Sequence, residues 1–552
     1  MTGVPDQHQP PIAPPDRAGS GGDFPRWAWG LALALLLLHA VLAWQTRTAG
    51  VTHSNDDALY ALLGKQIEHL SYRESFRVGA PLHGQYPPGW PALIAIANLA
   101  SGHREGAAFA LAMLLSTAAL LLFFDVARRL LPAGLAVGVL AAAALNPSEV
   151  AFGGRLMSEA AYWFWTSLTI WAMVRSKDSS RFLALAGGAA LVAAFTRSIG
   201  VTLVGALLVT WALERRWRAV GWLGGLSALL VGGWMIYTVQ THEAVVGRSY
   251  MADAGHFVQR VTGEGSQGSQ VVSMIANRIR EQVVGVIPAM MPLPRFNGTV
   301  LDNLLWLVVA VGCGLGGALA LRRRLPALVL YLVFYYGLLA IWPWAPRRFF
   351  IPIQPLVVLV LVLGAVSLAG RRREQLGWGA AGALLVAVLS IALPQTLRAA
   401  REMRQCDRGH PWTSSFCYDA DQRSFFAAVT FARDSLPPDA RFLVEREASF
   451  AYHTKRIVQH AQVATGFSGP EFLRYLTDKG IEYVVLTRLV NVELQTMAPK
   501  LRDACTRFEV VRHFPPYGRL YRLLPTDAPA GRNACADLNY FVTTTPLRPQ
   551  PR

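Results

Sequence analysis

The chain has 552 residues, of which 53% are hydrophobic and only 16% are charged, and its formal net charge is +17. An ordinary soluble domain has roughly 25% charged residues. A positive charge of this size is typical of nucleic-acid binders, but many of the arginines lie in short clusters between apolar runs too long for a soluble core. Composition therefore excludes a soluble enzyme, a disordered protein and a small disulfide-rich domain, and we expect no nucleic-acid partner.

The N-terminal segment differs from the rest of the chain. Residues 1–25 are rich in Pro, Gly, Asp and Gln without an apolar period, which predicts a disordered arm. The first apolar run, at about 27–44, is too long for a signal-peptide core and has no clear small-residue cleavage site. We expect it to remain as a membrane anchor.

Eleven apolar runs precede residue 395. The length of each is close to the about 20 residues that a helix needs to cross a bilayer. The predicted fold class is therefore a mostly α-helical, polytopic membrane protein, with about eleven transmembrane helices between residues 26 and 394. The runs lie at about 27–44, 106–126, 132–146, 157–174, 182–197, 198–213, 219–239, 301–320, 325–343, 350–369 and 376–394.

Basic clusters between the runs predict the orientation of the chain. Every cluster follows an even-numbered run, so all lie on one face, and the positive-inside rule makes that face cytoplasmic. The N-terminus is then cytoplasmic, and the tail after residue 394 is external. The clusters are Arg128-Arg129, Arg175/Lys177/Arg181, Arg215-Arg216/Arg218, Arg322-Arg323-Arg324 and Arg371-Arg372-Arg373.

The stretch 182–213 can be interpreted as one long helix or as a pair of helices. A single helix would put every later basic cluster on the external face. We therefore favour a tight pair that turns near Arg197.

Two predicted external loops, 47–105 and 240–300, are far longer than usual connections. Loops of this length are commonly functional, although the second can also be a spacer. The tail, 395–552, alternates strand-like and helix-like segments and predicts an external α/β domain. We expect strands at Arg441–Val444 and Tyr483–Leu486, a helix from Pro470 to Lys479, and a hairpin of 508–511 with 520–524.

Four of the five cysteines lie in this tail, and an even number in an external domain is typical of disulfides. Three pairings are possible, and we favour Cys406–Cys417 with Cys505–Cys535. The alternative is four unpaired buried thiols. Metal binding is less expected, because neither Cys-x-x-Cys nor paired His spacing occurs.

Two adjacent acids, Asp56 and Asp57, follow the first apolar run in a chain with few acids. A carboxylate in a partly dry cavity at the membrane surface can act as a general base. The alternative is a cap, in which Asn55 or Asp56 begins a helix from Ala58 to Leu70. Both can hold if one carboxylate caps the helix and the other faces substrate.

Three motifs resemble those of the GT-C superfamily of membrane glycosyltransferases, in particular the group that includes protein O-mannosyltransferases and the aminoarabinose transferase. The segment Asp56-Asp57-Ala58-Leu59-Tyr60 is similar to the acidic motif of their first external loop. The segment from Tyr86-Pro87-Pro88 to Ala95 is similar to a later part of that loop, and 347–355 resembles an Arg-Tyr-x-x-Pro-x-x-Pro element. Two departures are Asp57, where many relatives have Glu, and the missing Lys after the Pro-Pro pair.

The resemblance implies an inverting transfer of sugar from a polyprenyl-phosphate-linked donor to a hydroxyl of a lipid, glycan or protein acceptor. Asp56, with Asp57, would be catalytic and would accept the proton, and a basic residue would bind the leaving phosphate. Each arginine can instead be a snorkelling interfacial residue. The expected substrate-binding residues are Tyr60, His83, Tyr86, Arg155, Arg197, Arg347 and Arg348.

No cofactor and no metal are expected, although an Asp-Asp pair can bind a divalent ion. The expected location is the bacterial inner membrane, among its lipids, with the α/β domain in the periplasm. Two alternatives remain open: a transporter or flippase, and a non-catalytic scaffold of the same fold. A transporter usually has ionisable residues near the middle of its spans, whereas the acidic pair here lies in an external loop.

Overall fold

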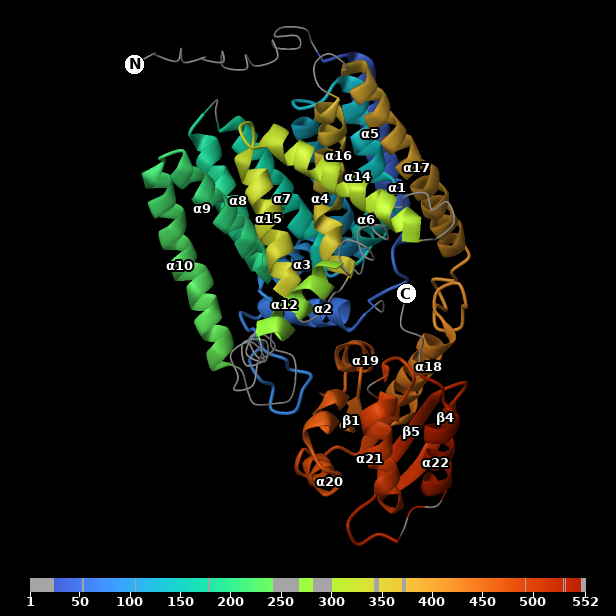
Figure 1. Cartoon of the computed structure of the whole chain (residues 1–552). Coiled ribbons are helices and arrows are strands. Elements are labelled where there is room, and N and C mark those ends of the chain that lie inside the picture. Colours follow the sequence, from blue (N-terminus) through green and yellow to red (C-terminus); the bar gives the residue numbers. More distant parts are fainter. Residues whose placement is uncertain are drawn as a thin grey trace, which may run out of the picture.

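The computed structural model shows a helical bundle with a smaller α/β domain below one end (Figure 1). It describes residues 24–51, 54–104, 106–176, 179–241, 268–280, 300–341, 347–369, 374–491, 493–529, 531 and 533–547. Three predictions lie outside these residues: the arm up to residue 23, most of the loop 240–300, and the Arg371 cluster.

All eleven predicted apolar runs form helices. Within the described residues, five helices are long and apolar enough to cross a membrane, or six if the bent pair α5 and α6 (Pro147–Gly153) is one span. The chain is thus a membrane protein, while the number of eleven spans stays a prediction. The helices are α1 (Arg26–Thr46), α4 (Gly106–Ala127), α5 (Ala133–Ala144), α7 (Ser158–Arg175), α8 (Arg181–Thr196), α9 (Val201–Leu213), α10 (Trp217–Gln240), α14 (Val300–Leu321), α15 (Pro326–Ile341), α16 (Gln354–Leu368) and α17 (Glu374–Arg404).

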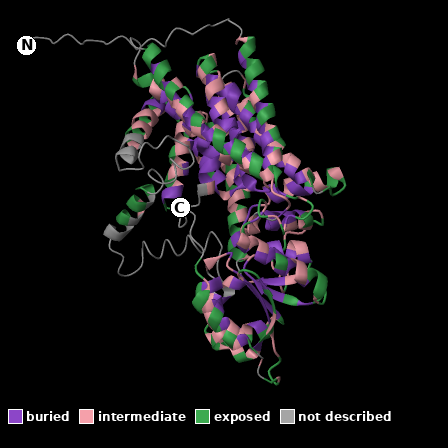
Figure 2. Ribbon diagram, turned by 90° about the vertical axis from the view of Figure 1, so that its right-hand side faces the viewer, coloured by how far each residue is buried: buried purple, intermediate pink, exposed green. Residues whose placement is uncertain are grey.

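The outer surface of the bundle is apolar. Figure 2 shows buried residues inside the bundle and many exposed residues on its outward helix faces. On α10, for example, Leu229 is 70% exposed and Ile236 is 60% exposed. Such a continuous apolar exterior is unfavourable in water and suits contact with lipid tails.

The predicted turn near Arg197 is confirmed. Helix α8 ends at Thr196, and a 3₁₀ turn, η1 (Ser198–Gly200), leads into α9, which packs back against α8. The turn needs Gly200, because a Cβ there would lie 2.5 Å from the backbone nitrogen of Ala194.

Two of the basic clusters meet at one end of the bundle, as their predicted common face requires. Asp125 near the end of α4 accepts hydrogen bonds from Arg128 at 2.7 Å and from Arg175 at 3.3 Å. It also accepts from the indole of Trp171 at 2.8 Å. One acid therefore binds arginines from α7 and from the turn after α4.

The loop 47–105, which was predicted to be external and is called the first loop below, contains two helices, α2 (Asn55–Ile67) and α3 (Gly89–Ser101), which lie at the end of the bundle that faces the α/β domain (Figure 1). The predicted start of α2 was wrong. Its cap is Ser54, whose hydroxyl accepts from the Asp57 amide while the Asp57 carboxylate accepts from the Ser54 amide at 3.1 Å. This reciprocal capping box starts the helix three residues earlier than Ala58.

The tail forms a five-stranded sheet with the order β2-β1-β3-β5-β4, in which the first three strands are parallel and the hairpin is antiparallel. The expected strands, helix and hairpin are confirmed; β2, α18, α19, α21 and α22 were not predicted. The elements are α18 (Ala420–Ser435), β1 (Arg441–Val444), α19 (Glu447–Thr454), β2 (Ile457–His460), α20 (Gly469–Asp478), β3 (Tyr483–Leu486), α21 (Ala498–Asp503), β4 (Phe508–Phe514), β5 (Gly518–Leu523) and α22 (Ala534–Thr544).

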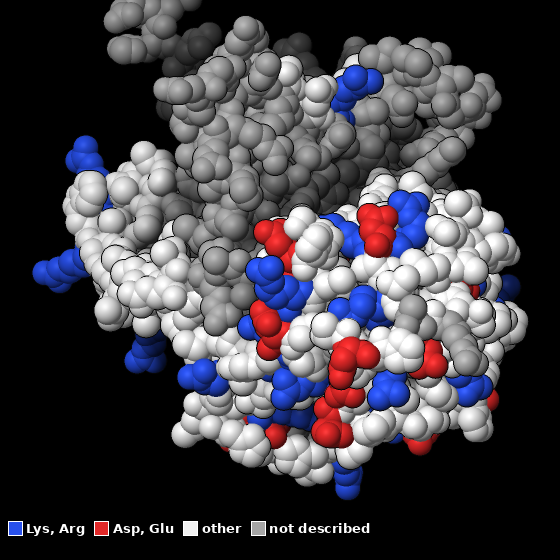
Figure 3. All heavy atoms as spheres, turned by 90° about the horizontal axis from the view of Figure 1, so that it is seen from below, with Lys and Arg blue, Asp and Glu red and all other residues white. Residues whose placement is uncertain are grey.

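The α/β domain packs directly on the first loop. Helix α19 contacts α2, and one hydrophobic core contains residues of both. The edge strand β2 pairs with the loop, since the amide of Val458 donates to the carbonyl of Phe76 at 2.8 Å and Arg77 forms a parallel bridge with Val458. Seen from below, the surface of the domain mixes acidic and basic side chains, without one dominant sign (Figure 3).

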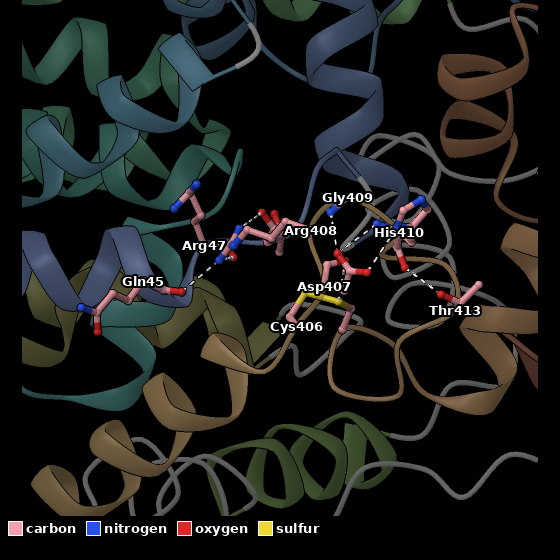
Figure 4. The surroundings of a disulfide bond; sticks show 10 residues. Gln45, Arg47, Cys406, Asp407, Arg408, Gly409, His410 and Thr413 are labelled. Atoms are coloured by element: carbon pink, nitrogen blue, oxygen red, sulfur yellow. Dashed lines mark hydrogen bonds and ion pairs between the residues drawn. A yellow bond between two sulfur atoms is a disulfide. The ribbon is translucent and has the colours of Figure 1, made fainter.

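Both favoured disulfides, Cys406–Cys417 and Cys505–Cys535, are present. The first closes a short loop after α17 that holds Arg408 against the C-terminus of α1 (Figure 4). The Arg408 guanidinium donates to the carbonyls of Gln45 and Arg47, both at 3.0 Å. These bonds satisfy carbonyls that lack partners at a helix end, and they fix the chain just before the acidic pair.

Candidate functional site

The two acids of the first loop have different roles. Asp57 is 1% exposed, and its carboxylate caps α2 through the Ser54 amide and also accepts from the Ala58 amide at 2.8 Å. Because Asp57 completes the cap, the side chain of the neighbouring Asp56 is not needed there and can point away from the start of the helix. One acid of the pair therefore belongs to the cap, but it is Asp57, whereas Asn55 or Asp56 was predicted to cap the helix; Asp56 is left for chemistry.

Asp56 contacts an arginine that lies 292 residues later in the sequence. Arg348 lies in η3 (Arg347–Ile353), a 3₁₀ segment before α16 that contains Pro352, and its Nη1 is 2.5 Å from Asp56 Oδ2. The hydroxyl of Tyr86 donates to Asp56 Oδ1 at 2.9 Å. Burial raises the pKa of Asp56, but the charge of Arg348 and hydrogen bonds from Arg348 and Tyr86 outweigh it and lower that pKa. Asp56 is therefore ionised at neutral pH.

A second acid, Glu159, connects two arginines. It lies in the first turn of α7 and is 1% exposed. Its Oε1 is 2.7 Å from Nη1 of Arg197 and 3.9 Å from Nε of Arg348. Arg197 also donates to the hydroxyl of Ser158 at 2.9 Å. A buried carboxylate that pairs with guanidinium groups fixes their direction, so both arginines are held in place.

These arginines line a small, partly open pocket. Its polar wall contains Arg197, Arg348 and the rings of Tyr60 and Tyr86. The remaining wall is largely apolar, as expected for a ligand with a charged group and a hydrocarbon part. Asp56 does not line the pocket itself, although both of its hydrogen-bond partners do. The full lining is Tyr60, Tyr86, Pro87, Thr196, Arg197, Ser198, Ile199, Leu338, Leu339, Arg348 and Phe349.

His83 lies behind the pocket and positions Tyr86. Its Nδ1 is 2.6 Å from Glu74 Oε1, and its Nε2 accepts from the Tyr86 amide at 2.9 Å. An imidazole that accepts at Nε2 and donates at Nδ1 is neutral. The structure therefore brings Tyr86 to the pocket and leaves His83 outside it, fully buried.

Two further predicted phosphate ligands are not brought to the pocket by any described contact. Arg155 lies between α6 and α7 with its guanidinium over the ring of Phe152 at 4.8 Å. Burial lowers the pKa of Arg155 to about 10, while the charges of Asp57 and Glu159 act in the opposite direction. Arg347 starts η3, but its side chain lies outside the described part of the chain.

Glu159 is not among the site residues predicted from the sequence, and no contribution of the α/β domain was predicted either. Glu159 follows Ser158 at the start of an apolar run, and an acid at that depth is itself a signal of function. Asn55, beside the catalytic candidate, contacts α19 across the domain boundary: its Oδ1 accepts from the Ala448 amide at 2.9 Å and its Nδ2 donates to Glu447 at 3.0 Å. No local sequence pattern predicts a contact between residues so far apart in the chain.

Comparison with solved structures identifies the fold. The oligosaccharyltransferase AglB from Archaeoglobus fulgidus, in complex with an inhibitory peptide and a dolichol-phosphate, matches with a TM-score of 0.52 and 12% identity, over 92% of this chain and 75% of that one. ArnT from Cupriavidus metallidurans in the apo state matches with a TM-score of 0.52 and 14% identity, over 90% of this chain and 98% of that one. The chain thus has the fold of the GT-C glycosyltransferases.

AglB tethered to an acceptor peptide that contains the NVT sequon is similar to the same degree, with a TM-score of 0.52 and 12% identity over 91% of this chain and 75% of that one. No family model matches the chain, and no curated protein matches it in sequence. The likeness is therefore one of fold, which by itself does not define function.

Proposed function

We propose that the chain is a membrane glycosyltransferase that transfers a sugar from a polyprenyl-phosphate-linked donor to an acceptor hydroxyl. The observation that carries the proposal is the ionised Asp56 beside Arg348 at the edge of the arginine-lined pocket. A base and a phosphate-binding cation are the two groups that this transfer requires, and here they are adjacent.

The pocket suits the lipid-phosphate part of the donor. The guanidinium groups of Arg348 and Arg197 can each bind two phosphate oxygens, and Leu338, Leu339 and Phe349 supply apolar contact for the first isoprene units. The AglB structure of the same fold was solved with a dolichol-phosphate, a lipid of this chemical class. Tyr60 and Tyr86 lie at the polar side, where the sugar would lie.

In the proposed reaction, the oxygen of the acceptor hydroxyl attacks the anomeric carbon of the donor sugar. The bond from that carbon to the phosphate oxygen breaks, and the polyprenyl phosphate leaves with its charge held by Arg348 and Arg197. The hydroxyl proton goes to the Asp56 carboxylate, and the configuration at the anomeric carbon inverts. Asp57 acts only through the cap that fixes the direction of Asp56.

The proposed location is a bacterial inner membrane, with the N-terminus in the cytoplasm and the α/β domain in the periplasm. Support comes from Asp125, which forms ion pairs with Arg129 and Arg175 at the end of the bundle remote from α2 and α3. Both arginines belong to the basic clusters that the positive-inside rule assigns to the cytoplasmic face. The two disulfides of the tail also fit an oxidising compartment. The proposed step is written without a metal.

The proposal is tested in a strain that lacks this gene, by mass spectrometry of its lipids and glycans. We expect one sugar modification to disappear and wild-type protein to restore it. Asp56→Asn should not restore the modification, whereas the matched neighbour Asp57→Asn, which keeps a capping oxygen, should restore most of it. Restoration by Asp56→Asn at the wild-type level would contradict the role of Asp56, and unchanged glycans in the deletion strain would contradict transferase activity.

A further inference from the structure

A series of short contacts leads from Glu74, a buried residue of the first loop, to the Asp56 carboxylate. The Glu74 Oε1 atom is 2.6 Å from Nδ1 of His83, and Nε2 of His83 accepts from the Tyr86 amide at 2.9 Å. The hydroxyl of Tyr86 in turn donates to Asp56 Oδ1 at 2.9 Å. Glu74 is therefore connected to the proposed base through two intervening residues, although it does not line the pocket itself.

The Glu74 carboxylate determines which nitrogen of His83 carries the proton. Burial raises the pKa of Glu74, but the charge of Arg77 and the hydrogen bond from His83 outweigh it and lower that pKa. An ionised carboxylate can only accept, so Nδ1 of His83 donates to it and Nε2 is left without a proton. Only this tautomer accepts from the Tyr86 amide, because the other would place two N–H groups against each other.

The second oxygen of Glu74 connects this arrangement to the α/β domain. Its Oε2 is 2.7 Å from Nε of Arg77. Nη2 of the same guanidinium donates at 2.8 Å to Glu447, in the first turn of α19. Arg77 thus lies between two buried carboxylates, one from the loop and one from the α/β domain, and these ion pairs fix the direction of Glu74.

We propose that Glu74 is a positioning residue for the transfer reaction: by fixing the tautomer of His83, it holds Tyr86 where the Tyr86 hydroxyl supports the Asp56 carboxylate. This inference rests on the proposed function. A base is effective when its oxygen is held in line with the hydroxyl that loses the proton. Without the Tyr86 bond, only Arg348 orients Asp56 among the contacts described above, so the rate of proton transfer falls while the donor pocket is unchanged.

The competing explanation is that Glu74 only stabilises the fold of the loop. The loop backbone has its own hydrogen bonds, since the His83 amide donates to the Tyr72 carbonyl at 2.9 Å and the Glu74 amide to the Pro81 carbonyl at 2.8 Å. The two explanations predict different amide protection when the Glu74 side chain is changed. If Glu74 only stabilises the loop, the His83 and Tyr86 amides both lose protection, whereas a positioning role affects the Tyr86 amide alone.

The first test is hydrogen exchange in the purified full-length chain in detergent. Glu74→Leu removes the acceptor of His83 Nδ1, and Glu74→Gln retains an oxygen that can accept from it. The matched control is Arg73→Gln, because Arg73 is an exposed residue of the same loop that donates to the Ala80 carbonyl at 3.3 Å. The two amides that are compared are those of His83 and Tyr86.

We expect the Tyr86 amide of Glu74→Leu to exchange about tenfold faster than in wild type, and its His83 amide to exchange at the wild-type rate. Glu74→Gln and Arg73→Gln should keep both rates. Wild-type exchange of the Tyr86 amide in Glu74→Leu would overturn the inference. Equal acceleration of the two amides would also overturn it, because the loop as a whole would then have opened.

The second test is the rate of transfer from the lipid-linked sugar that the glycan analysis identifies. Glu74→Leu should lower kcat by about tenfold with little change in donor KM, and Glu74→Gln should restore most of this loss. If Glu74 acts through the Tyr86 hydroxyl, Glu74→Leu should slow Tyr86→Phe by no more than about twofold. Full multiplication of the two effects would overturn the inference.

The same assay includes Asp56→Asn, so that failure of the inference and failure of the proposed function can be told apart. An inactive Asp56→Asn together with a wild-type kcat in Glu74→Leu would contradict only the role of Glu74. Wild-type activity in Asp56→Asn would contradict the proposed function, and the inference with it.

Discussion

The contact of Glu447 with the first loop is predicted to hold the α/β domain on the site. The Glu447 carboxylate is buried and accepts from Arg77 Nη2 at 2.8 Å and from Asn55 Nδ2 at 3.0 Å. His460 Nε2 lies 3.4 Å from the same carboxylate. Glu447→Ala removes all three contacts and leaves the backbone of α19 unchanged.

Removal of one partner from a buried ion pair costs about 3–5 kcal/mol. Here Arg77 keeps Glu74, whose Oε2 is 2.7 Å from Arg77 Nε, and the Arg77 side chain is 21% exposed. We therefore expect the lower end, about 3 kcal/mol including the Asn55 bond, which corresponds to roughly a hundredfold change in the equilibrium between docked and undocked loop.

Hydrogen exchange measures this equilibrium directly, because the Val458 amide donates to the Phe76 carbonyl across the boundary. In Glu447→Ala the Val458 amide should exchange about a hundredfold faster, while amides inside β3 keep their wild-type rates. The control Asp434→Ala removes an exposed pair with Arg433 and should change neither. Wild-type exchange at Val458 in Glu447→Ala would refute the assigned role of Glu447.

Three further predictions concern pH, donor binding and the anchor of α1. Burial lowers the pKa of His453 from 6.5 to about 4, so the unfolded state binds more protons between these values and stability rises with pH across that window, by about 3 kcal/mol at most; His453→Gln should flatten this rise in denaturation measurements. Arg348→Ala should weaken undecaprenyl phosphate binding by about tenfold or more, measured on the purified chain. Arg408→Ala removes bonds to the carbonyls that end α1 and should cost about 2 kcal/mol, seen as a lower thermal midpoint, whereas the exposed Arg398→Ala should not shift it.

The helices of the bundle could be predicted from sequence because each depends on its own composition. A long apolar run in lipid must pair its backbone groups internally and so forms a helix, and all eleven runs did so, although only five or six of the described helices are long enough to cross a membrane. The turn at Arg197 was also predictable, since the alternation of basic clusters required two helices there. The two strands and the hairpin of the tail were found for a similar local reason.

The start of α2 and the long-range contacts of Asn55 and Asp56 could not be predicted from local sequence patterns. Ser54 competes with Asn55 as a cap, and sequence alone does not show that Asn55 is engaged with Glu447, 392 residues away. Likewise Asp56 and Arg348 are 292 residues apart, and only the resemblance to a known family put them in one site before the fold was seen. Contacts of this kind depend on the packing of whole elements rather than on local pattern.

The central claim is that Asp56 is the base for sugar transfer from a lipid phosphate, and its most direct test is the rate of transfer by purified Asp56→Asn. The donor is the lipid-linked sugar that the glycan analysis identifies, and the readout is release of polyprenyl phosphate. We predict that kcat falls by about 10²–10⁴-fold while donor KM changes little, because Arg348 and the pocket remain. A kcat within a few-fold of wild type would contradict the account.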